Sequence, residues 1–305
     1  MRINPFVKQR SKPKPPRSDV TEALAQLARL AEQHTDLADL AAVHAALLRV
    51  AFENALPTPQ LAIDAAHAAT KLMAGVPLLR GEHLALDPSW LQQRYLQLCD
   101  ALLALPNGRN DTTAYGSGAT EALRQAVSKN KLDIHAAMIE VLAGDPRMIV
   151  QRAEQFDLDA TLAATLLRWT LLPVLEQVAK QVEPHRKNMS WDKGYCPTCG
   201  AWPLLVERRG IEQRLFARCG LCASEWETEH IVCPFCRTRS HFDLAYLYDE
   251  AQEATQRVMT CERCHCYYKS VSTLVPLSTP QLLVTDLATL HLDLIALERA
   301  YGPPG

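Results

Sequence analysis

Eight of the ten cysteines in this chain stand in four C-x-x-C pairs, all of them after residue 195. A C-x-x-C turn directs both sulfurs to one side, and two such turns together supply the four thiolates of a closed tetrahedral metal site. The candidate metal ligands, in their four pairs, are Cys196 and Cys199, Cys219 and Cys222, Cys233 and Cys236, and Cys261 and Cys264. These residue types predict metal binding, and no acid, base and nucleophile in the chain have a spacing that predicts catalysis.

The intervals between the pairs indicate two metal ribbons in series. Nineteen residues separate the two pairs of the first set, as in many metal ribbons, and twenty-four separate those of the second set, which a longer hairpin accommodates. Each interval contains its own turn signal, at 207–210 and at 248–253. Sequential grouping of the pairs is therefore favoured, and a crossed grouping stays open as an alternative.

Thiol chemistry is the main alternative to metal binding at these cysteines. The sequence CPFC at Cys233 resembles the dithiol of small redox proteins, in which a helix N-terminus lowers the thiol pKa. Here CPFC precedes a turn and a strand-like run, RTRSHFDLAYLY, so that helix is not expected. Tetrahedral thiolate sites accept both zinc and iron, and the ligands alone leave that choice open. Of the two remaining cysteines, Cys99 is interpreted as a small buried apolar residue and Cys266 as an inward-facing strand residue.

The residues before the cysteine pairs have the apolar pattern of a helical domain. Over 18–185, apolar residues recur at intervals of three and four, which predicts amphipathic helices. A capping residue ahead of a proline predicts helix starts at Thr58 and Asp87, and GVPLLRGEH from Gly75 predicts an extended connection. Further helices are predicted over 117–128, 131–143, 146–156 and 159–182. The histidines in these patterns are interpreted as ordinary surface or core residues: His44, His67 and His135.

After residue 185 the apolar period falls from about 3.6 to about 2, which predicts short strands. The strand-like runs are PLLVERR, IEQRLFAR, EWETEHIV, HFDLAYLY, TQRVMT and CYYKSVSTLV, and a helical pattern returns from Thr279. The predicted fold class is α+β, with an N-terminal all-helical domain, two tandem rubredoxin-like or zinc-ribbon modules, and a C-terminal helix. The predicted domains are a basic mobile arm over 1–17, the helical domain over 18–185, metal ribbons over 186–230 and 231–278, and the C-terminal helix and tail over 279–305.

Composition and charge limit the classes of partner. The chain has 305 residues, of which 48% are apolar, and a net charge of −2, so it can bury a sizeable core but has no overall field that attracts nucleic acid. No apolar run approaches the roughly 20 residues of a spanning helix, so a cytoplasmic protein without membrane insertion is expected.

A zinc-ribbon nucleic-acid-binding protein stays an alternative. It needs a basic face, but residues 190–280 hold ten Lys and Arg against eleven Asp and Glu. No contact with nucleic acid is therefore predicted. Four arginines could still form a local basic patch: Arg208, Arg209, Arg214 and Arg218.

Four segments of the C-terminal half carry motifs that are more specific than a generic zinc ribbon. They are YCPTCG from Tyr195, ARCGLCASEW from Ala217, LYDEAQEATQRVMTCERC from Leu247 and VTDLATLHLDLIALERAYG from Val284. In the order of these segments and in the spacing of all four cysteine pairs, the chain resembles the formate dehydrogenase accessory proteins of FdhE type. The N-terminal half is similar to that family mainly in being helical and in GVPLL from Gly75.

The resemblance implies a cytoplasmic maturation factor and chaperone, not an enzyme, which is required for formate dehydrogenase activity and binds the catalytic subunit of that enzyme. It also implies two rubredoxin-like modules that bind iron at two sites, with zinc as a substitute, through the eight paired cysteines. His265 stands where related metal knuckles often have Gly, and Cys266 is additional to the family pattern. Electron transfer or thiol redox work by the metal modules stays a further alternative, and homo-oligomerisation is left open.

Overall fold

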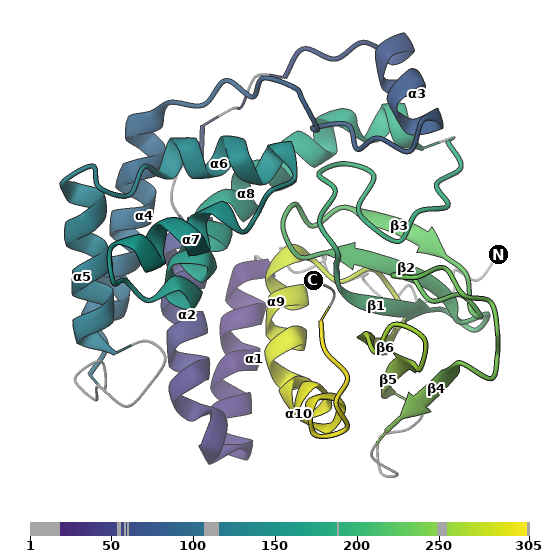
Figure 1. Ribbon diagram of the computed structural model, residues 1–305. Coiled ribbons are helices and arrows are strands. Elements are labelled where there is room, and N and C mark those ends of the chain that lie inside the picture. Colours follow the sequence, from purple (N-terminus) through teal and green to yellow (C-terminus); the bar gives the residue numbers. More distant parts are fainter. Residues whose placement is uncertain are drawn as a thin grey trace, which may run out of the picture.

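The computed structural model describes residues 19–53, 56–57, 59, 61–106, 116–187, 189–248 and 255–303, so the predicted arm over 1–17 lies outside the described residues. The helices before the first strand are α1 (Asp19–Gln33), α2 (Ala38–Glu53), α3 (Ala65–Met73), α4 (Pro88–Leu103), α5 (Ser117–Ser128), α6 (Ile134–Ala143), α7 (Met148–Gln155) and α8 (Ala160–Arg186). A short 3₁₀ helix, η1 (Thr35–Leu37), joins α1 to α2. The predicted helical domain is therefore present as a layer of helices on one side of the molecule (Figure 1).

Aspartate caps fix several of these helix starts. Asp87 accepts a hydrogen bond from the Ser89 N–H just ahead of Pro88, as predicted, because a proline at the first helical position lacks only an N–H that has no partner there. The start predicted at Thr58 falls on a residue outside the described ones; the described residues from 59 to 64 lie in no helix, and α3 begins at Ala65 after an Asp64 cap. The segment before that cap is extended, and Leu61 and Ile63, two residues apart, both pack against a small apolar cluster.

Six strands form one mixed sheet. They are β1 (Pro203–Arg209), β2 (Arg214–Cys219), β3 (Glu225–Thr228), β4 (Leu244–Leu247), β5 (Gln256–Cys261) and β6 (Tyr267–Thr273), in the order β3-β2-β1-β6-β5-β4. Each predicted ribbon contributes an antiparallel group of three strands, and β1 pairs with β6 in parallel, from Val206 opposite Ser270 to Arg209 opposite Thr273. The two ribbons are therefore joined edge to edge, and the domain boundaries given above stay a prediction.

The turn of the first ribbon lies later than predicted. Strand β1 continues to Arg209, which pairs with Arg214, so the chain reverses over 210–213 rather than 207–210. Gly210 and Gln213 at its two ends both have left-handed backbones, with φ of 66° and 52°. Glycine adopts that conformation without steric cost, which explains why the reversal follows Gly210. The turn predicted at 248–253 lies almost wholly outside the described residues.

The C-terminal helical segment is two helices and not one. Helix α9 (Thr279–Ala288) begins at a capping box of Ser278 and Gln281, and α10 (Leu290–Glu298) follows it directly. Thr289 stands at the break, fully buried, and its hydroxyl donates to the Thr285 and Asp286 carbonyl oxygens of the last turn of α9. The bend lets α9 pack on α1 while α10 packs on β5, so this segment lies between the two halves (Figure 1).

Among the described helices none is, by itself, both long and apolar enough to cross a membrane. Helices α9 and α10 reach that length and composition only when they are taken together across their 47° bend.

A continuous apolar core joins the helical half to the first ribbon. It contains buried side chains of α1, α2, α4 and α8 together with strand residues such as Val206 and Trp226. The buried cysteines at 196, 199, 219 and 222 belong to the same core. The helices and the first cysteine cluster therefore pack as one unit, whereas Val258 of β5 packs with α10 in a separate small cluster.

Candidate metal centres

The first cysteine cluster brings together four buried sulfur atoms. Cys196, Cys199, Cys219 and Cys222 have their Sγ atoms within 4.8 Å of one another. The Sγ–Sγ distance is 3.6 Å between Cys196 and Cys222 and 3.4 Å between Cys199 and Cys219. Sulfurs about 2.3 Å from a shared tetrahedral ion stand about 3.8 Å apart, so these four fit one metal ion with little adjustment.

The second cysteine cluster has the same arrangement nearer the surface. Cys233 and Cys264 have their sulfurs 3.6 Å apart, and Cys236 and Cys261 have theirs 3.7 Å apart. All four Sγ atoms again lie within 4.8 Å of one another, but Cys236 and Cys264 are partly exposed. The structure thus confirms the sequential grouping of the pairs and not the crossed one. Both four-cysteine sites are able to bind a metal.

Burial makes a cation necessary if these sulfurs are to be thiolates together. Burial raises the pKa of the Cys219 thiol, and it raises that of Cys261 in the second cluster. Four negative sulfurs this close together also repel one another strongly in a medium of low dielectric constant. A divalent or trivalent ion removes both penalties, which is why such sulfur sets are typical of metal sites.

Each C-x-x-C turn, which we call a knuckle, is followed by a residue with a left-handed backbone conformation. The position after the second cysteine of every pair has a positive φ, with values of 85° at Gly200, 57° at Ala223, 62° at Arg237 and 53° at His265. Inside a knuckle, backbone N–H groups approach the sulfur of its first cysteine: the Leu221 and Cys222 nitrogens lie 3.3 and 3.4 Å from Cys219 Sγ. A non-glycine residue therefore fits at His265, at a steric cost of about 1 kcal/mol.

The C-terminal tail covers the second knuckle around His265. The carbonyl oxygen of His265 accepts a hydrogen bond from the Gly302 N–H, and the Tyr301 hydroxyl donates to Glu262. Cys266 lies outside the four-sulfur set, where its thiol is 3.5 Å from the Cys264 carbonyl oxygen. The extra cysteine is thus a neighbour of the site and not a fifth member of the cluster.

A loop of the helical half is bonded directly to the first knuckle. In the segment 75–82, the Leu78 N–H donates to the Pro197 carbonyl oxygen at 2.9 Å, and the Leu79 N–H donates to that of Thr198 at 2.8 Å. The loop thus pairs with the two residues between Cys196 and Cys199. The sequence predicted an extended connection here, but it did not predict this contact, because the partners are more than a hundred residues apart.

Lys71 of α3 holds that loop in place. Its Nζ, in a side chain that is 9% exposed, donates to the carbonyl oxygens of Leu78 and Arg80 and to Glu82 Oε1, at 2.8, 2.6 and 2.6 Å. Sequence reasoning missed this residue. The signal that could have found it is spacing, because Lys71 follows Ala68 by three residues on the buried face of α3, where a lysine needs buried partners.

The two knuckles also contact each other. A Cβ built on Gly194 would lie 1.7 Å from the Pro234 carbonyl oxygen, so only glycine fits where the chain enters the first knuckle. Beside this contact the rings of Trp202 and Phe235 meet edge to face, with centroids 5.3 Å apart. The two candidate metal centres are therefore mechanically linked through their own loops, in addition to the pairing of β1 with β6.

The other residues named from the sequence lie away from both clusters. Cys99 is fully buried, and burial raises its pKa to about 12, in agreement with an apolar role. Burial also lowers the pKa of His44, whose ring packs against Trp169 in the helical core. His67 lies on the surface next to Glu82, 2.8 Å away.

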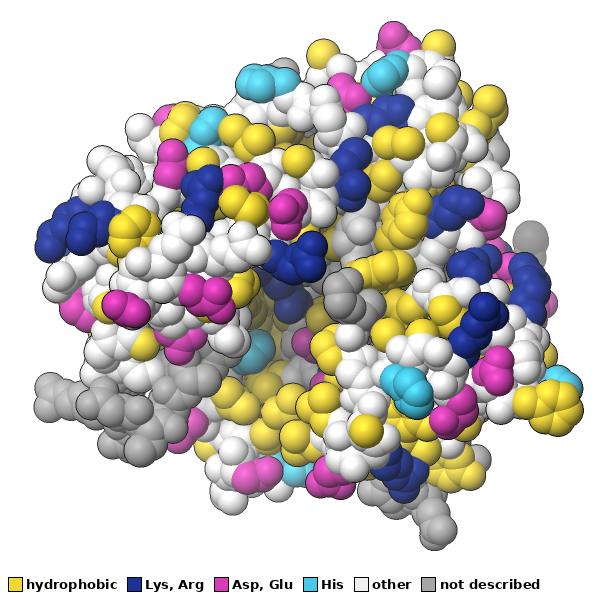
Figure 2. Space-filling view, in the orientation of Figure 1, with side chains coloured by type: hydrophobic (Ala, Val, Ile, Leu, Met, Phe, Trp, Pro, Cys, Tyr) yellow, Lys and Arg dark blue, Asp and Glu magenta, His cyan; other side chains and the backbone are white. Residues whose placement is uncertain are grey.

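The four arginines that could form a local basic patch are largely neutralised by carboxylates. Arg209 and Arg218 both pair with the buried Glu207, and Arg214 pairs with Glu227 at 2.7 Å. On the face that Figure 2 shows, Lys and Arg side chains are likewise interspersed with Asp and Glu. Neither observation favours a nucleic-acid interface.

The chain is similar to known proteins over most of its length, although no family model matches it. The protein FdhE homolog of Stutzerimonas stutzeri is 28% identical over 297 residues, which cover 94% of this chain and 88% of the relative. That of Edwardsiella ictaluri is 29% identical over 82% of this chain and 75% of its own length. That of Aquifex aeolicus, at 27% identity, matches over about half of each chain, 47% and 52%. The crystal structure of the FdhE protein from Pseudomonas aeruginosa superposes with a TM-score of 0.61 at 26% identity, covering 94% of both chains.

Proposed function

Because this chain belongs to the FdhE family, we propose that it is an accessory protein that binds the catalytic subunit of formate dehydrogenase and is required for that enzyme to become active. The observation that carries the proposal is the combination of two four-cysteine clusters with a fold that is similar to an FdhE crystal structure over 94% of the chain. The accessory role itself comes from the resemblance of the motifs described above.

In this proposal the eight clustered cysteines are metal ligands, and iron is the native ion at both sites. Zinc is accepted as a substitute, because a tetrahedral thiolate set holds either ion. The bound ion neutralises the thiolates and cross-links two hairpins at each site, which supplies much of the ordering free energy of ribbons with little core of their own. The protein itself is proposed to hold and not to transform its client, so no catalytic residue is assigned.

The two sites are proposed to differ in their roles. All four sulfurs of the first site are buried in the core shared with the helices, and the loop 75–82 is bonded to its knuckle. Such a site supports the link between ribbon and helical half. The second site has two partly exposed sulfurs, at Cys236 and Cys264, so it is the one from which metal exchanges faster. Competition with a chelator, followed by metal analysis, is expected to show one fast and one slow ion per chain.

The proposal is tested in cells that lack this protein. Formate dehydrogenase activity is expected to be absent, to return with the intact chain, and to stay absent when Cys196 and Cys199 are both replaced by Ser. Replacement of Cys99, which lies outside both clusters, is the matched control and is expected to restore activity fully. Full activity in the deleted strain, or no capture of the catalytic subunit by the tagged chain, would refute the proposed function.

A further inference from the structure

A row of cavities follows the outer edge of β3. In the strand order β3 is terminal, so only one of its edges is paired. Three cavities border its other edge. The first, of about 330 Å³, is lined by residues 223–225, the second, of about 490 Å³, by 225–227, and the third, of about 380 Å³, by 227–230. The second cavity shares Glu225 with the first and Glu227 with the third, so the three follow one another along the strand. We call this row of cavities the β3 groove.

The far wall of the β3 groove is an extended segment that does not pair with the strand. Residues 189–191 line the second cavity and residues 191–193 line the third, each opposite the strand. In the described parts of these two segments, no backbone hydrogen bond joins 189–193 to 225–230. The sheet edge and the segment therefore run past each other with a space of several hundred Å³ between them.

The free edge of β3 presents backbone groups to this space. Arg186 donates from its Nη1 to the Glu225 carbonyl oxygen at 3.0 Å, and Arg186 belongs to α8, outside the sheet. The backbone of Glu225 thus faces away from β2. Backbone direction alternates along an antiparallel strand, so the N–H and C=O of Glu227, two residues on, also point outward. Arg186 occupies one end of the edge, and the Glu227 groups face the groove beyond it.

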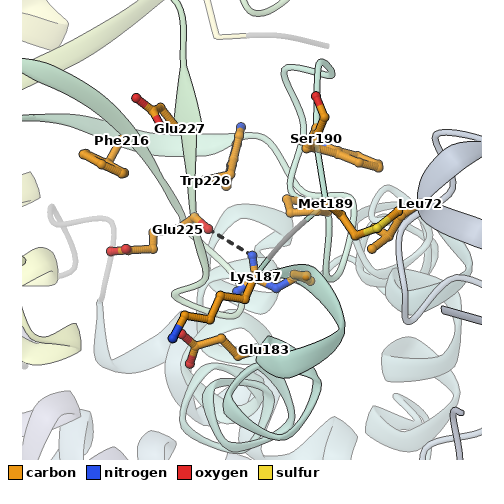
Figure 3. Close-up of a pocket in the computed structure, with 12 residues that line it drawn as sticks. Leu72, Glu183, Lys187, Met189, Ser190, Phe216, Glu225, Trp226 and Glu227 are labelled. Atoms are coloured by element: carbon orange, nitrogen blue, oxygen red, sulfur yellow. Dashed lines mark hydrogen bonds between the residues drawn. The ribbon is translucent and has the colours of Figure 1, made fainter. Parts of the chain in front are cut away.

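The middle cavity combines apolar walls with polar groups that have no protein partner. Figure 3 shows Trp226 on the side of the strand that faces Met189 and Leu72, whereas Phe216 and Glu227 lie on the other side of the strand. Trp226 is 6% exposed, and its indole N–H has no hydrogen-bond partner among the described residues. The Nε of Arg186 is also buried and has no hydrogen-bond partner among the described residues. A buried donor without an acceptor is costly, and a ligand carbonyl in this cavity would remove that cost.

We propose that an extended peptide segment of a partner protein docks in the β3 groove as an added strand. The elongated shape, the outward Glu227 backbone groups and the orphan indole N–H all match a peptide backbone, which offers an N–H and a C=O every second residue on one side. One apolar side chain of the peptide fills the cavity between Trp226 and Met189. The inference rests on the proposed function only for the identity of the partner, a segment of the formate dehydrogenase catalytic subunit.

The sharpest test removes a single backbone donor. Glu227→Pro deletes the outward N–H, and it keeps the pairing with β2 because that N–H does not take part in it. Glu227→Ala is the matched control, since it loses the same side chain and its pairing with Arg214 but keeps the N–H. Trp226→Phe removes only the indole N–H while an aromatic ring remains. Metal content and circular dichroism verify that each variant is folded.

The probe is a set of 12-residue peptides selected from a random phage-displayed library on the intact chain, with Kd measured by fluorescence polarisation. Binding is expected to weaken at least tenfold with Glu227→Pro and about fivefold with Trp226→Phe, and to change less than twofold with Glu227→Ala. Peptides N-methylated at every second position are expected to lose binding to the unaltered chain, which keeps the test decisive if the proline variant does not fold. Equal binding to the proline and alanine variants would overturn the inference, and so would a ligand weakened by Trp226→Phe alone, which would indicate a compact ligand and not a strand.

Capture of the formate dehydrogenase catalytic subunit separates the two proposals. Capture that is lost with Glu227→Pro and kept with Glu227→Ala supports both. Equal capture by the two variants overturns the groove inference and leaves the proposed function in place. Failure of the unaltered chain to capture the subunit, with the selected peptides still behaving as expected, refutes the proposed function and leaves the groove inference standing.

Discussion

Replacing Lys71 with Met tests whether the helical half holds the first metal knuckle in place. The methionine side chain has nearly the length of lysine and fits the same buried path, but it donates no hydrogen bond. Two carbonyl oxygens of the loop 75–82 and the Glu82 carboxylate then lose their shared ammonium partner. The loop therefore loses its side-chain attachment to α3, while its two backbone bonds to the knuckle remain.

The expected magnitude follows from the burial of these groups. A hydrogen bond from a charged donor contributes about 1.5–3 kcal/mol, and breaking a buried ion pair by removing one partner costs about 3–5 kcal/mol. Glu82 is itself partly exposed and keeps a second partner, His67, at 2.8 Å, so the lower part of this range applies. We expect local opening of the loop to become easier by about 3 kcal/mol, which corresponds to roughly a hundredfold.

Hydrogen exchange at the amides of Leu78 and Leu79 measures this opening directly, because those N–H groups donate to the knuckle. Lys71→Met is expected to accelerate their exchange about a hundredfold. Lys180→Met is the control, since Lys180 lies on α8 with its side chain 68% exposed, and its pairing with Glu176 is worth only about 0.5 kcal/mol or less. A change of less than threefold at both amides in Lys71→Met would refute the view that this lysine fixes the loop.

Three further predictions follow from the knuckles. Cys222→Ser is expected to remove about one of two metal ions per chain, the one in the first site, as elemental analysis would measure; loss of both ions would contradict separate sites. Ala223→Gly removes the steric strain of an alanine with a left-handed backbone and is expected to raise the free energy of unfolding by about 1 kcal/mol. The control Ala245→Gly in β4 is expected to lower it by about 0.5–1 kcal/mol. Denaturant titration measures both, and changes of the same sign in the two variants would contradict this. Gly194→Ala is expected to force the two knuckles apart, because its Cβ would meet Pro234, and faster proteolysis within the ribbons than in the unaltered chain checks it; unchanged cleavage would show that the contact is dispensable.

Patterns of short range were predictable from the sequence. The two four-cysteine sets follow from ligand spacing, since two hairpins can close around one ion without help from the rest of the fold. The strand-like runs correspond to β1 to β6 because a repeat of about two residues is that of an extended chain. The burial of β1, β5 and β6 on both faces, with four consecutive buried residues each, comes from the packing around them. Helix α4 begins where Asp87 and Pro88 place it, because a cap acts within a few residues. A proline alone does not start a helix: among the described residues after Pro59, the first helix is α3, which begins at Ala65 after its own Asp64 cap.

Contacts between distant segments were decided only by the tertiary structure. Nothing in β1 or β6 alone specifies that they pair in parallel, nor that the loop 75–82 bonds to the first knuckle. The break at Thr289 has the same origin, since one continuous helix could not pack on both α1 and β5. Such contacts depend on which surfaces remain to be buried once the local elements have formed, and on the geometry that brings them together. The sequence by itself therefore determined the sulfur clusters and most helices and strands. The assembly of those elements decided the hydrogen bonds between the loop 75–82 and the first knuckle, and it left one edge of β3 unpaired.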